Sequence, residues 1–329
     1  MTSMSHTAII GAGIAGLACA RRLSEAGRTV RLFDKGRGVG GRMATRRVET
    51  PSGVAQFDHG AQYVAVRDER FRSALNATGP AVAPWEAART GLATRNPAAG
   101  PGDTPLVGSP TMSAIPRALA AGLDTQVSTR IASILRTAKG WVLEKEDGSS
   151  EGPFESVVIA TPAEQAGPLL SAHSKRLAEE AAEATTAPCW AGLFAFSASP
   201  GSDLQAWKPV DHPVISWAAC DSAKPERPNA LSCWVVHARP DWSVTHLERP
   251  ADEIISLLRK DLEAMIGNGP ELVLAQAHRW RYALVEKAAP SPFGWDADLG
   301  LGTCGDWRIG ARVEAAWLSG HELAGAMLA

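Results

Sequence analysis

The sequence predicts an α/β fold, in which a mainly parallel sheet with covering helices is interrupted by a second, mixed α/β domain. Three observations support this prediction. Residues 7–33 follow the order strand, glycine turn, helix and strand. Residues 156–162 (SVVIATP) form a continuous apolar run, which is typical of a parallel strand buried on both faces. From residue 166 to about 275 a charged helix and tryptophan-bearing strands follow, which predicts the inserted domain.

Length and charge indicate the class of partner. A chain of 329 residues is long for a single hydrophobic core, so two domains are expected. The formal net charge is only −2, which creates no field that would favour nucleic acid or an anionic membrane as the main partner. An apolar strand already begins at residue 8, and no uncharged apolar run of membrane-spanning length follows. We therefore expect a soluble, cytoplasmic protein that acts on a small molecule.

Cysteine and histidine spacing gives no sign of a disulfide framework or a metal site. The cysteines are odd in number, widely spaced and without a CxxC pair, and they stand at positions 19, 189, 220, 233 and 304. The eight histidines show no HExxH or similar ligand spacing. We expect buried thiols and no metal.

The first 34 residues carry a dinucleotide-binding pattern of the Rossmann type. Gly11 permits a tight turn after the first strand, Gly13 lets the backbone approach a pyrophosphate, and Gly16 lets the helix pack closely on the strand. The following helix, at about 14–26, points its free N–H groups at the phosphates. Asp34 lies 18 residues after Gly16, at the end of the second strand, where it can accept the hydrogen bonds of a ribose diol.

The stretch after Asp34 favours FAD over NAD. Residues 35–47 (KGRGVGGRMATRR) predict a flexible basic coil in place of another helix. Gly40 and Gly41 allow the backbone to lie against a ligand, and Arg42 can place a forked cation on the pyrophosphate. These features suit a long dinucleotide that binds in an extended form.

The C-terminal segment 302–328 predicts a second cofactor contact. A Gly-Asp turn at Asp306 precedes a helix with apolar residues at helical spacing from about residue 311. In a flavoprotein, Asp306 would lie near the ribityl hydroxyls, and the positive helix end would lie near N1 and O2 of the ring. The alternative is a plain amphipathic helix packed on the sheet.

These segments resemble a known superfamily. The GxGxxG turn, the acid followed by GGR at 34–42 and the C-terminal Gly-Asp resemble the glutathione-reductase-like FAD superfamily, which includes the flavin amine oxidases. The more specific stretches FDHGAQY (57–63), WSVTHL (242–247) and HRWRYA (278–283) resemble bacterial renalase-like proteins along nearly the whole chain. The resemblance implies a p-hydroxybenzoate hydroxylase-like topology, a non-covalent FAD and an inserted mixed α/β substrate domain.

The domain boundaries follow from these placements. We expect the discontinuous FAD-binding domain to comprise residues 1–75, 106–165 and 276–329, and the substrate-binding domain to comprise residues 76–105 and 166–275. Residues 85–105, rich in Ala, Gly and Pro, predict an irregular excursion.

The motifs and the resemblance together predict the site residues. The predicted substrate-binding residues are Tyr63 and His246. At His59, where the family usually carries an apolar residue, we favour a backbone contact over a role as a base. The predicted cofactor contacts are Gly11, Gly13, Ile14, Ala15, Gly16, Asp34, Lys35, Gly41, Arg42, His59, Gly60, Ala61, Gln62, Ile131, Asp306 and Val313.

The resemblance implies oxidation of the 2- and 6-dihydro isomers of NAD(P) to NAD(P)+, with O2 reduced to hydrogen peroxide. A dihydropyridine that regains aromaticity needs positioning more than acid–base help. A flavin amine oxidase is the alternative, although the chain has only Tyr63 and Tyr282 as tyrosines and no cysteine between 283 and 303. An aromatic hydroxylase and a non-catalytic FAD-binding sensor or interaction protein also stay open.

Overall fold

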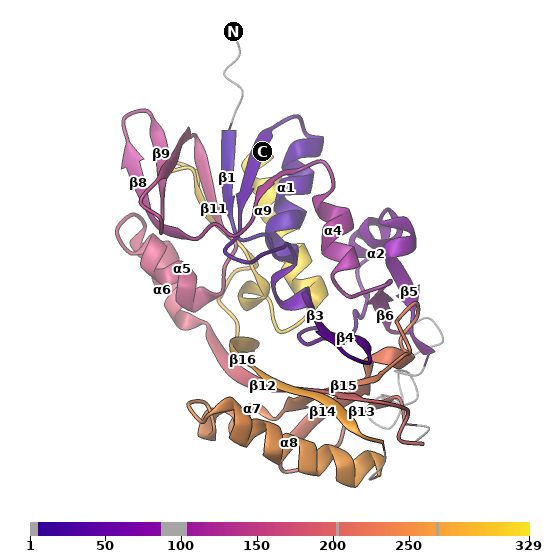
Figure 1. Cartoon of the computed structure of the whole chain (residues 1–329). Helices are drawn as coiled ribbons and strands as arrows, with labels where there is room; N and C mark the ends of the chain where they lie inside the picture. Colours follow the sequence, from indigo (N-terminus) through magenta and orange to yellow (C-terminus); the bar gives the residue numbers. More distant parts are fainter. Residues whose placement is uncertain (1–5, 87–103, 202–203, 268–269) are drawn as a thin grey trace. The chain divides into compact units, whose positions relative to one another are not determined.

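The computed structural model describes residues 6–86, 104–201, 204–267 and 270–329 (Figure 1). The chain forms two compact units. The first unit comprises Met1–Gly41, Pro116–Thr186 and Val285–Ala329, and the second comprises Arg42–Ile115 and Ala187–Leu284. Most of the irregular excursion predicted at 85–105 lies outside the described residues.

The sheet of the first unit is the predicted parallel sheet. It has six strands in the order β17-β18-β11-β1-β2-β7. All neighbours pair in parallel except β17 with β18. The bounds are β1 His6–Ile10, β2 Thr29–Phe33, β7 Asp124–Gln126, β11 Ser156–Ile159, β17 Gly294–Asp296 and β18 Leu301–Thr303. The predicted strands at 7–10, 29–33 and 156–162 are therefore present, the last ending earlier than expected.

Two helices of this unit pack tightly on each other, α1 (Ile14–Glu25) and α9 (Val313–Leu328). The close approach depends on glycine, because a Cβ at Gly320 would collide with the backbone oxygen of Ala15. Ser319 ties α9 to two loops of the same unit, since its hydroxyl accepts from the Gly305 N–H at 3.0 Å and donates to the Pro292 carbonyl at 2.6 Å. The predicted C-terminal helix is thus confirmed.

A small antiparallel sheet completes the first unit, in the order β10-β9-β8. Its strands are β8 Ile131–Thr137, β9 Gly140–Lys145 and β10 Ser150–Phe154, and two helices follow, α5 Ala163–Leu170 and α6 Lys175–Glu183. The charged helix expected after residue 166 is α6, and its start is set by Ser174, whose side chain accepts from the Leu177 N–H. Trp141 and Trp307 lie in the shared core of this unit.

The second unit is built on a five-stranded sheet in the order β13-β14-β15-β12-β16. The bounds are β12 Thr185–Phe196, β13 Ala206–Trp207, β14 Ile215–Cys220, β15 Ser232–Ala238 and β16 Leu272–Lys287. Helices α7 (Pro240–Thr245) and α8 (Ala251–Ile266) lie on one face (Figure 1). Along α8 the residues Ile254, Leu258, Leu262 and Ile266 face the sheet core at helical spacing.

The other face of this sheet is covered by a β-hairpin, β3 (Thr45–Thr50) and β4 (Gly53–Asp58). Ala55 and Phe57 pack there against Leu193 and Val235. The expectation of a coil throughout 35–47 is therefore wrong at its end, where η1 (Gly41–Met43) and β3 form. The smaller elements are α2 Glu69–Asn76, η2 Gly79–Ala81, β5 Val82–Pro84, β6 Leu106–Gly108, α4 Ala114–Ala120, η3 Asp221–Ala223 and η4 Asp306–Arg308.

The compact units divide the chain at other positions than the domains proposed from the motifs. Residues 42–75 group with the second unit, because the β3–β4 hairpin packs on its sheet. Residues 166–186 group with the first unit, which contains α5 and α6. The assignment of ligands to the domains stays a prediction.

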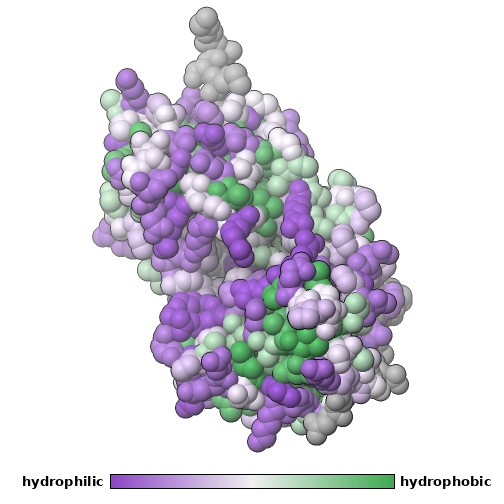
Figure 2. Space-filling view, viewed as in Figure 1, coloured by the Kyte–Doolittle hydropathy of each residue, from purple (hydrophilic) through white to green (hydrophobic). Residues whose placement is uncertain are grey.

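The visible surface is mixed in character. Figure 2 shows hydrophilic side chains over much of this face, with smaller apolar patches between them. None of the helices in the described ranges has the length and apolarity that a bilayer crossing requires.

Candidate functional site

The glycine turn after β1 is an open cradle at the start of α1. Gly11 has a φ of +108°, and a Cβ there would lie 2.8 Å from the Ala160 carbonyl oxygen. A Cβ at Gly16 would collide with the carbonyl oxygen of Gly11, so the helix packs against its own turn. At Gly13, in contrast, a Cβ would meet no atom within 4 Å. The space beside Gly13 is therefore available to a ligand.

The N-terminus of α1 points its backbone donors into this turn. Gly13 is the N-cap and provides no side-chain acceptor. The first intrahelical bond runs from Leu17 N–H to Gly13 O at 3.0 Å, which leaves the N–H groups of Ile14, Ala15 and Gly16 outside the helical ladder. Such a helix end favours a phosphate, because the N–H groups and the helix dipole both attract negative charge.

The structure brings the second glycine motif to the first. Gly40 N–H donates to the Ala12 carbonyl at 2.8 Å, and Gly40 forms a parallel bridge with Gly13. Gly41 has a φ of +53°, and a Cβ there would lie 3.7 Å from Gly13 Cα. Two motifs that are separate in the sequence thus form one backbone surface within the first unit.

Asp34 ties these two loops together. Its Oδ2 accepts from the Ala12 N–H at 2.7 Å, and its Oδ1 accepts from the Gly36 N–H at 2.7 Å. A carboxylate oxygen can accept more than one hydrogen bond, so the predicted ribose contact remains compatible with this role. Lys35 donates to Gln165 Oε1 at 3.0 Å, and partial burial together with Arg130 lowers its pKa. Ile131 is buried in the core, so its side chain packs there.

The C-terminal turn of the first unit is held by polar contacts that the sequence did not predict. Asp306 is buried, and its carbonyl accepts from the N–H groups of Ile309 and Gly310. Arg308 is buried beside it and pairs with Glu180 at 2.7 Å. Val313 begins α9, and Glu314 is buried in the first turn of that helix. The helix start therefore already has a carboxylate near its positive end.

In the second unit, Arg42 joins two of the recognised motifs. Its Nη1 donates to the Ala283 carbonyl at 3.1 Å, at the end of the HRWRYA stretch. Its own carbonyl accepts from the Ala61 N–H at 2.8 Å, within the FDHGAQY stretch. A Cβ at Gly60 would collide with the same Arg42 carbonyl, so only glycine allows this approach. Arg42, Gly60 and Ala61 thus lie together.

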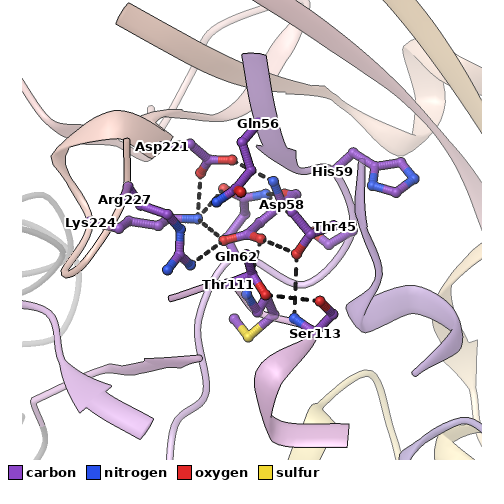
Figure 3. A network of polar contacts seen from close by, with 12 residues as sticks. Thr45, Gln56, Asp58, His59, Gln62, Thr111, Ser113, Asp221, Lys224 and Arg227 are labelled. Atoms are coloured by element: carbon purple, nitrogen blue, oxygen red, sulfur yellow. Dashed lines mark hydrogen bonds and ion pairs between the residues drawn. The ribbon is translucent and has the colours of Figure 1, made fainter. Parts of the chain in front are cut away.

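Asp58 is the centre of a buried charge network (Figure 3). Its Oδ2 contacts Arg227 Nη2 at 2.6 Å and Lys224 Nζ at 3.4 Å, and its Oδ1 accepts from Thr45 at 2.6 Å. Lys224 Nζ also pairs with Asp221 Oδ1 at 2.5 Å. The four ionic side chains are at most 2 % exposed, and their two positive and two negative charges balance.

The network separates the pKa values of the two acids. Burial acts to raise the pKa of Asp58, but Lys224 and Arg227 outweigh it and leave that pKa below its usual range. Burial raises the pKa of Asp221 to about 6, although Lys224 opposes the shift. Asp58 is therefore the acid that the cations stabilise in its charged form.

Gln62 and Tyr63 behave differently from each other. The Gln62 amide donates to the Asp58 carbonyl, and its oxygen accepts from Trp217 at 3.2 Å and Lys224 at 3.3 Å. Because the donor and acceptor of that side chain already form hydrogen bonds inside the unit, any contact of Gln62 with a cofactor would be made by its backbone. The Tyr63 ring lies 5.5 Å from Trp217, and burial raises its pKa.

His246 lies at the end of α7, beside an open groove. Its ring stacks on Trp242 at 3.9 Å, and its Nδ1 contacts the Trp242 carbonyl at 2.8 Å. The His246 carbonyl accepts from Trp190, which lines the groove. The groove is lined by Trp190, Glu248, Arg249, Pro250, Ala251, Ala277, His278 and Arg279. The described contacts do not join His246 to Tyr63.

An imidazole and indole cluster surrounds His59, and the sequence did not predict it. The His59 carbonyl accepts from Trp280 Nε1 at 2.9 Å and from His237 Nε2 at 3.1 Å. The His59 ring lies 5.0 Å from Trp280 and 4.9 Å, edge-on, from His278. Two of these partners stand in the HRWRYA stretch, so that motif was the available signal.

Comparisons with known proteins agree with this geometry. The profile described as NAD(P)-binding Rossmann-like domain matches residues 9–77, and the profile described as Flavin containing amine oxidoreductase matches residues 70–328.

Solved structures with the same fold cover nearly the entire chain at low identity. A putative protoporphyrinogen oxidase from Exiguobacterium sp. 255-15 is 13 % identical, with a TM-score of 0.74 and coverage of 99 % of each chain. Reduced UDP-galactopyranose mutase is 12 % identical, with a TM-score of 0.74 and coverage of 100 % of this chain and 94 % of that one. A double mutant of putrescine oxidase is 13 % identical, with a TM-score of 0.69 and coverage of 98 % and 99 %.

Proposed function

Because the chain belongs to the flavin-containing amine oxidoreductase family, whose profile matches residues 70–328, we propose that it oxidises 2- or 6-dihydro isomers of NAD(P). Membership of this family identifies the protein as an FAD-dependent oxidoreductase that acts on a small molecule. The proposed reaction breaks a C–H bond of the dihydropyridine and transfers hydride. With O2 and one proton, the products are NAD(P)+ and hydrogen peroxide. FAD, when bound, supplies the hydride acceptor and the reduction of oxygen.

The cradle at Gly13 is the observation that supports FAD binding. Open space beside Gly13, the N–H groups at the start of α1 and the bridging Gly40 present the backbone donors that a pyrophosphate requires. We propose that Asp34 holds the adenosine ribose, and that Gly41 and Arg42 contact the pyrophosphate. Lys35, Ile131, Asp306 and Val313 complete the predicted contacts of the first unit.

The proposed FAD is held without a covalent bond. Cys304, the cysteine nearest the last helix, is fully buried, and burial raises the pKa of its thiol to about 12. A thiol in that state is a poor nucleophile, because the thiolate is the reactive form. From the second unit, we propose that His59, Gly60, Ala61 and Gln62 contact the flavin through the backbone.

Neutral aromatic side chains support a hydride donor as the substrate. Burial lowers the pKa of His59 to about 3, and burial lowers those of His237 and His278 to about 4. These rings are uncharged at neutral pH, which suits a reaction that needs orientation more than proton transfer. We propose that Tyr63 and His246 help to position the dihydronicotinamide.

Oxidation of an amine is the second candidate, because the family is named for it and putrescine oxidase shares the fold. A protein that binds FAD without turnover is the candidate of another class. Neither candidate requires a dihydronicotinamide.

Anaerobic mixing with 6-dihydro-NAD, an amine panel and ordinary NADPH separates these candidates. We expect rapid loss of flavin absorbance with 6-dihydro-NAD alone. Bleaching by amines alone would establish the second candidate, and rapid bleaching by NADPH would indicate a hydroxylase. No bleaching by any of them would favour the binding protein.

A further inference from the structure

The His59 imidazole contains a buried acceptor that the chain leaves without a donor. The side chain belongs to a residue that is only 5 % exposed, and Nδ1 has no hydrogen-bond partner among the residues that the structure describes. The ring also forms a hydrogen bond with the Ala44 backbone, which falls to the other nitrogen, Nε2. A buried acceptor without a donor is unfavourable, and most such atoms in folded proteins have a partner.

The position of this atom is held by contacts to the backbone carbonyl of His59 and to its ring. The carbonyl of His59 accepts from His237 on β15 and from Trp280 on β16. The ring packs against Trp280 and His278, which also contact each other at 4.3 Å between ring centroids. Figure 3 shows the imidazole turned away from the charge network around Asp58. The neighbouring Gly60 lies directly against the Arg42 carbonyl, where a Cβ would collide with it.

The ring is neutral, so Nδ1 acts as an acceptor. Burial, followed by His278 and Arg46, lowers the pKa of His59, and the Ala44 contact opposes this shift. The Ala44 contact favours the protonated ring, so the ring is the donor in it. The N–H therefore lies on Nε2 and points at the Ala44 carbonyl. The groups that act on the ring come from β3, β15 and β16, and they are Arg46, His237 and His278.

We propose that Nδ1 of His59 accepts a hydrogen bond from an N–H group of a flat heterocycle bound to the enzyme. The surrounding indole and imidazole rings suit such a ligand, because they offer flat apolar faces beside one acceptor. The N–H group belongs either to the flavin ring or to the carboxamide of the dihydronicotinamide. The second source rests on the proposed function, and the first rests on FAD binding alone. Nδ1 of His59 disfavours a ligand that places a carbonyl oxygen next to it, because two acceptors cannot form a hydrogen bond.

Two substitutions test this proposal. His59→Phe keeps a flat ring and removes the acceptor, whereas His59→Asn places an amide oxygen near the position of Nδ1. We expect the Phe variant to bind one of the two ligands about tenfold more weakly, and the Asn variant to stay within about threefold of the wild type. His173→Phe is the matched control, because His173 lies in the first unit, where its Nε2 contacts the Ile134 carbonyl at 2.8 Å.

Separate readouts identify the source of the N–H group. Titration of the flavin-free protein with FAD and the midpoint potential of the bound flavin report on the flavin. A raised KM for 6-dihydro-NAD at unchanged kcat reports on the substrate. If the Phe variant matches the wild type within about twofold in FAD affinity and KM, and its midpoint potential is unchanged, the proposal is wrong. It is also wrong if Asn and Phe lose the same affinity, because a packing role would account for that result.

Nuclear magnetic resonance of the wild-type ring keeps the proposal testable if a variant does not fold. The Nδ1 signal of ¹⁵N-labelled His59 is expected to move when FAD or 6-dihydro-NAD is added, while the Nε2–H tautomer persists. An unchanged signal with both ligands would contradict the proposal. If the enzyme does not oxidise 6-dihydro-NAD but its FAD affinity still depends on His59, the proposed function is refuted and this inference stands.

Discussion

We expect Lys224→Met to lower the free energy of unfolding of the second unit by about 3–5 kcal/mol, the usual cost of breaking a buried ion pair. The Lys224 side chain is 0 % exposed, and it is the cation that lies 2.5 Å from Asp221. Its removal leaves Arg227 to balance both carboxylates, so the network changes from neutral to a net charge of −1. In a unit of this size each kcal/mol lowers Tm by about 2–4 °C, so a loss of roughly 10 °C is expected.

The loss should depend on pH in a defined direction. The pKa of Asp221 is about 6 in the folded protein, above its ordinary value of 3.8. The folded state therefore binds more protons between about pH 4 and pH 6, and stability falls as pH rises through that window. Without Lys224 the folded pKa rises further, because the largest opposing cause is gone. The variant should lose less stability at pH 5 than at pH 7.5.

Chemical denaturation at these two pH values is the assay, with Lys175→Met as the control. Lys175 pairs with Glu179 at 3.6 Å, but its side chain is 88 % exposed, so no measurable loss is expected. A variant as stable as the wild type at pH 7.5 would refute the reasoning. A larger loss at pH 5 than at pH 7.5 would refute the role assigned to Asp221.

Three further predictions concern the cradle, Arg42 and the packing of α9. Gly11→Ala should lower the free energy of unfolding by about 1–3 kcal/mol, because Gly11 has a φ of +108° and a Cβ there would lie close to the Ala160 oxygen. Gly13→Ala should unfold like the wild type but bind FAD more weakly. Equal FAD affinity in the two variants would contradict this contrast. Arg42→Ala should lower FAD retention on purification. Arg37→Ala is the control and should not, because Arg37 is an exposed residue of the same basic stretch. Full flavin content in the Arg42 variant would refute its role. Ser319→Ala should cost about 1–3 kcal/mol in thermal unfolding, since it strands the buried Gly305 N–H and the Pro292 carbonyl; an unchanged Tm would contradict this.

The sequence alone determined the elements and motifs that depend on local chemistry. The signals are local, because each extends over no more than about 30 residues of the chain. They are a parallel strand flanked by glycines, a 3.6-residue apolar period and an acid at a strand end. For this reason the βαβ unit at 7–33, the last helix and the FAD class could be predicted. The roles of Tyr63 and His246 stay predictions.

Only the tertiary structure decided which polar atoms are used and which are left over. Asp58 meets Lys224, and His59 meets Trp280, across more than 160 residues of chain. No local pattern encodes such pairs, because burial and charge compensation depend on what folding brings alongside. The same reason explains why the Gln62 side chain is hydrogen-bonded to its neighbours whereas Nδ1 of His59 is not. Sequence periodicity determines which face of an element is apolar, whereas only the assembled unit determines which buried polar atom finds a partner.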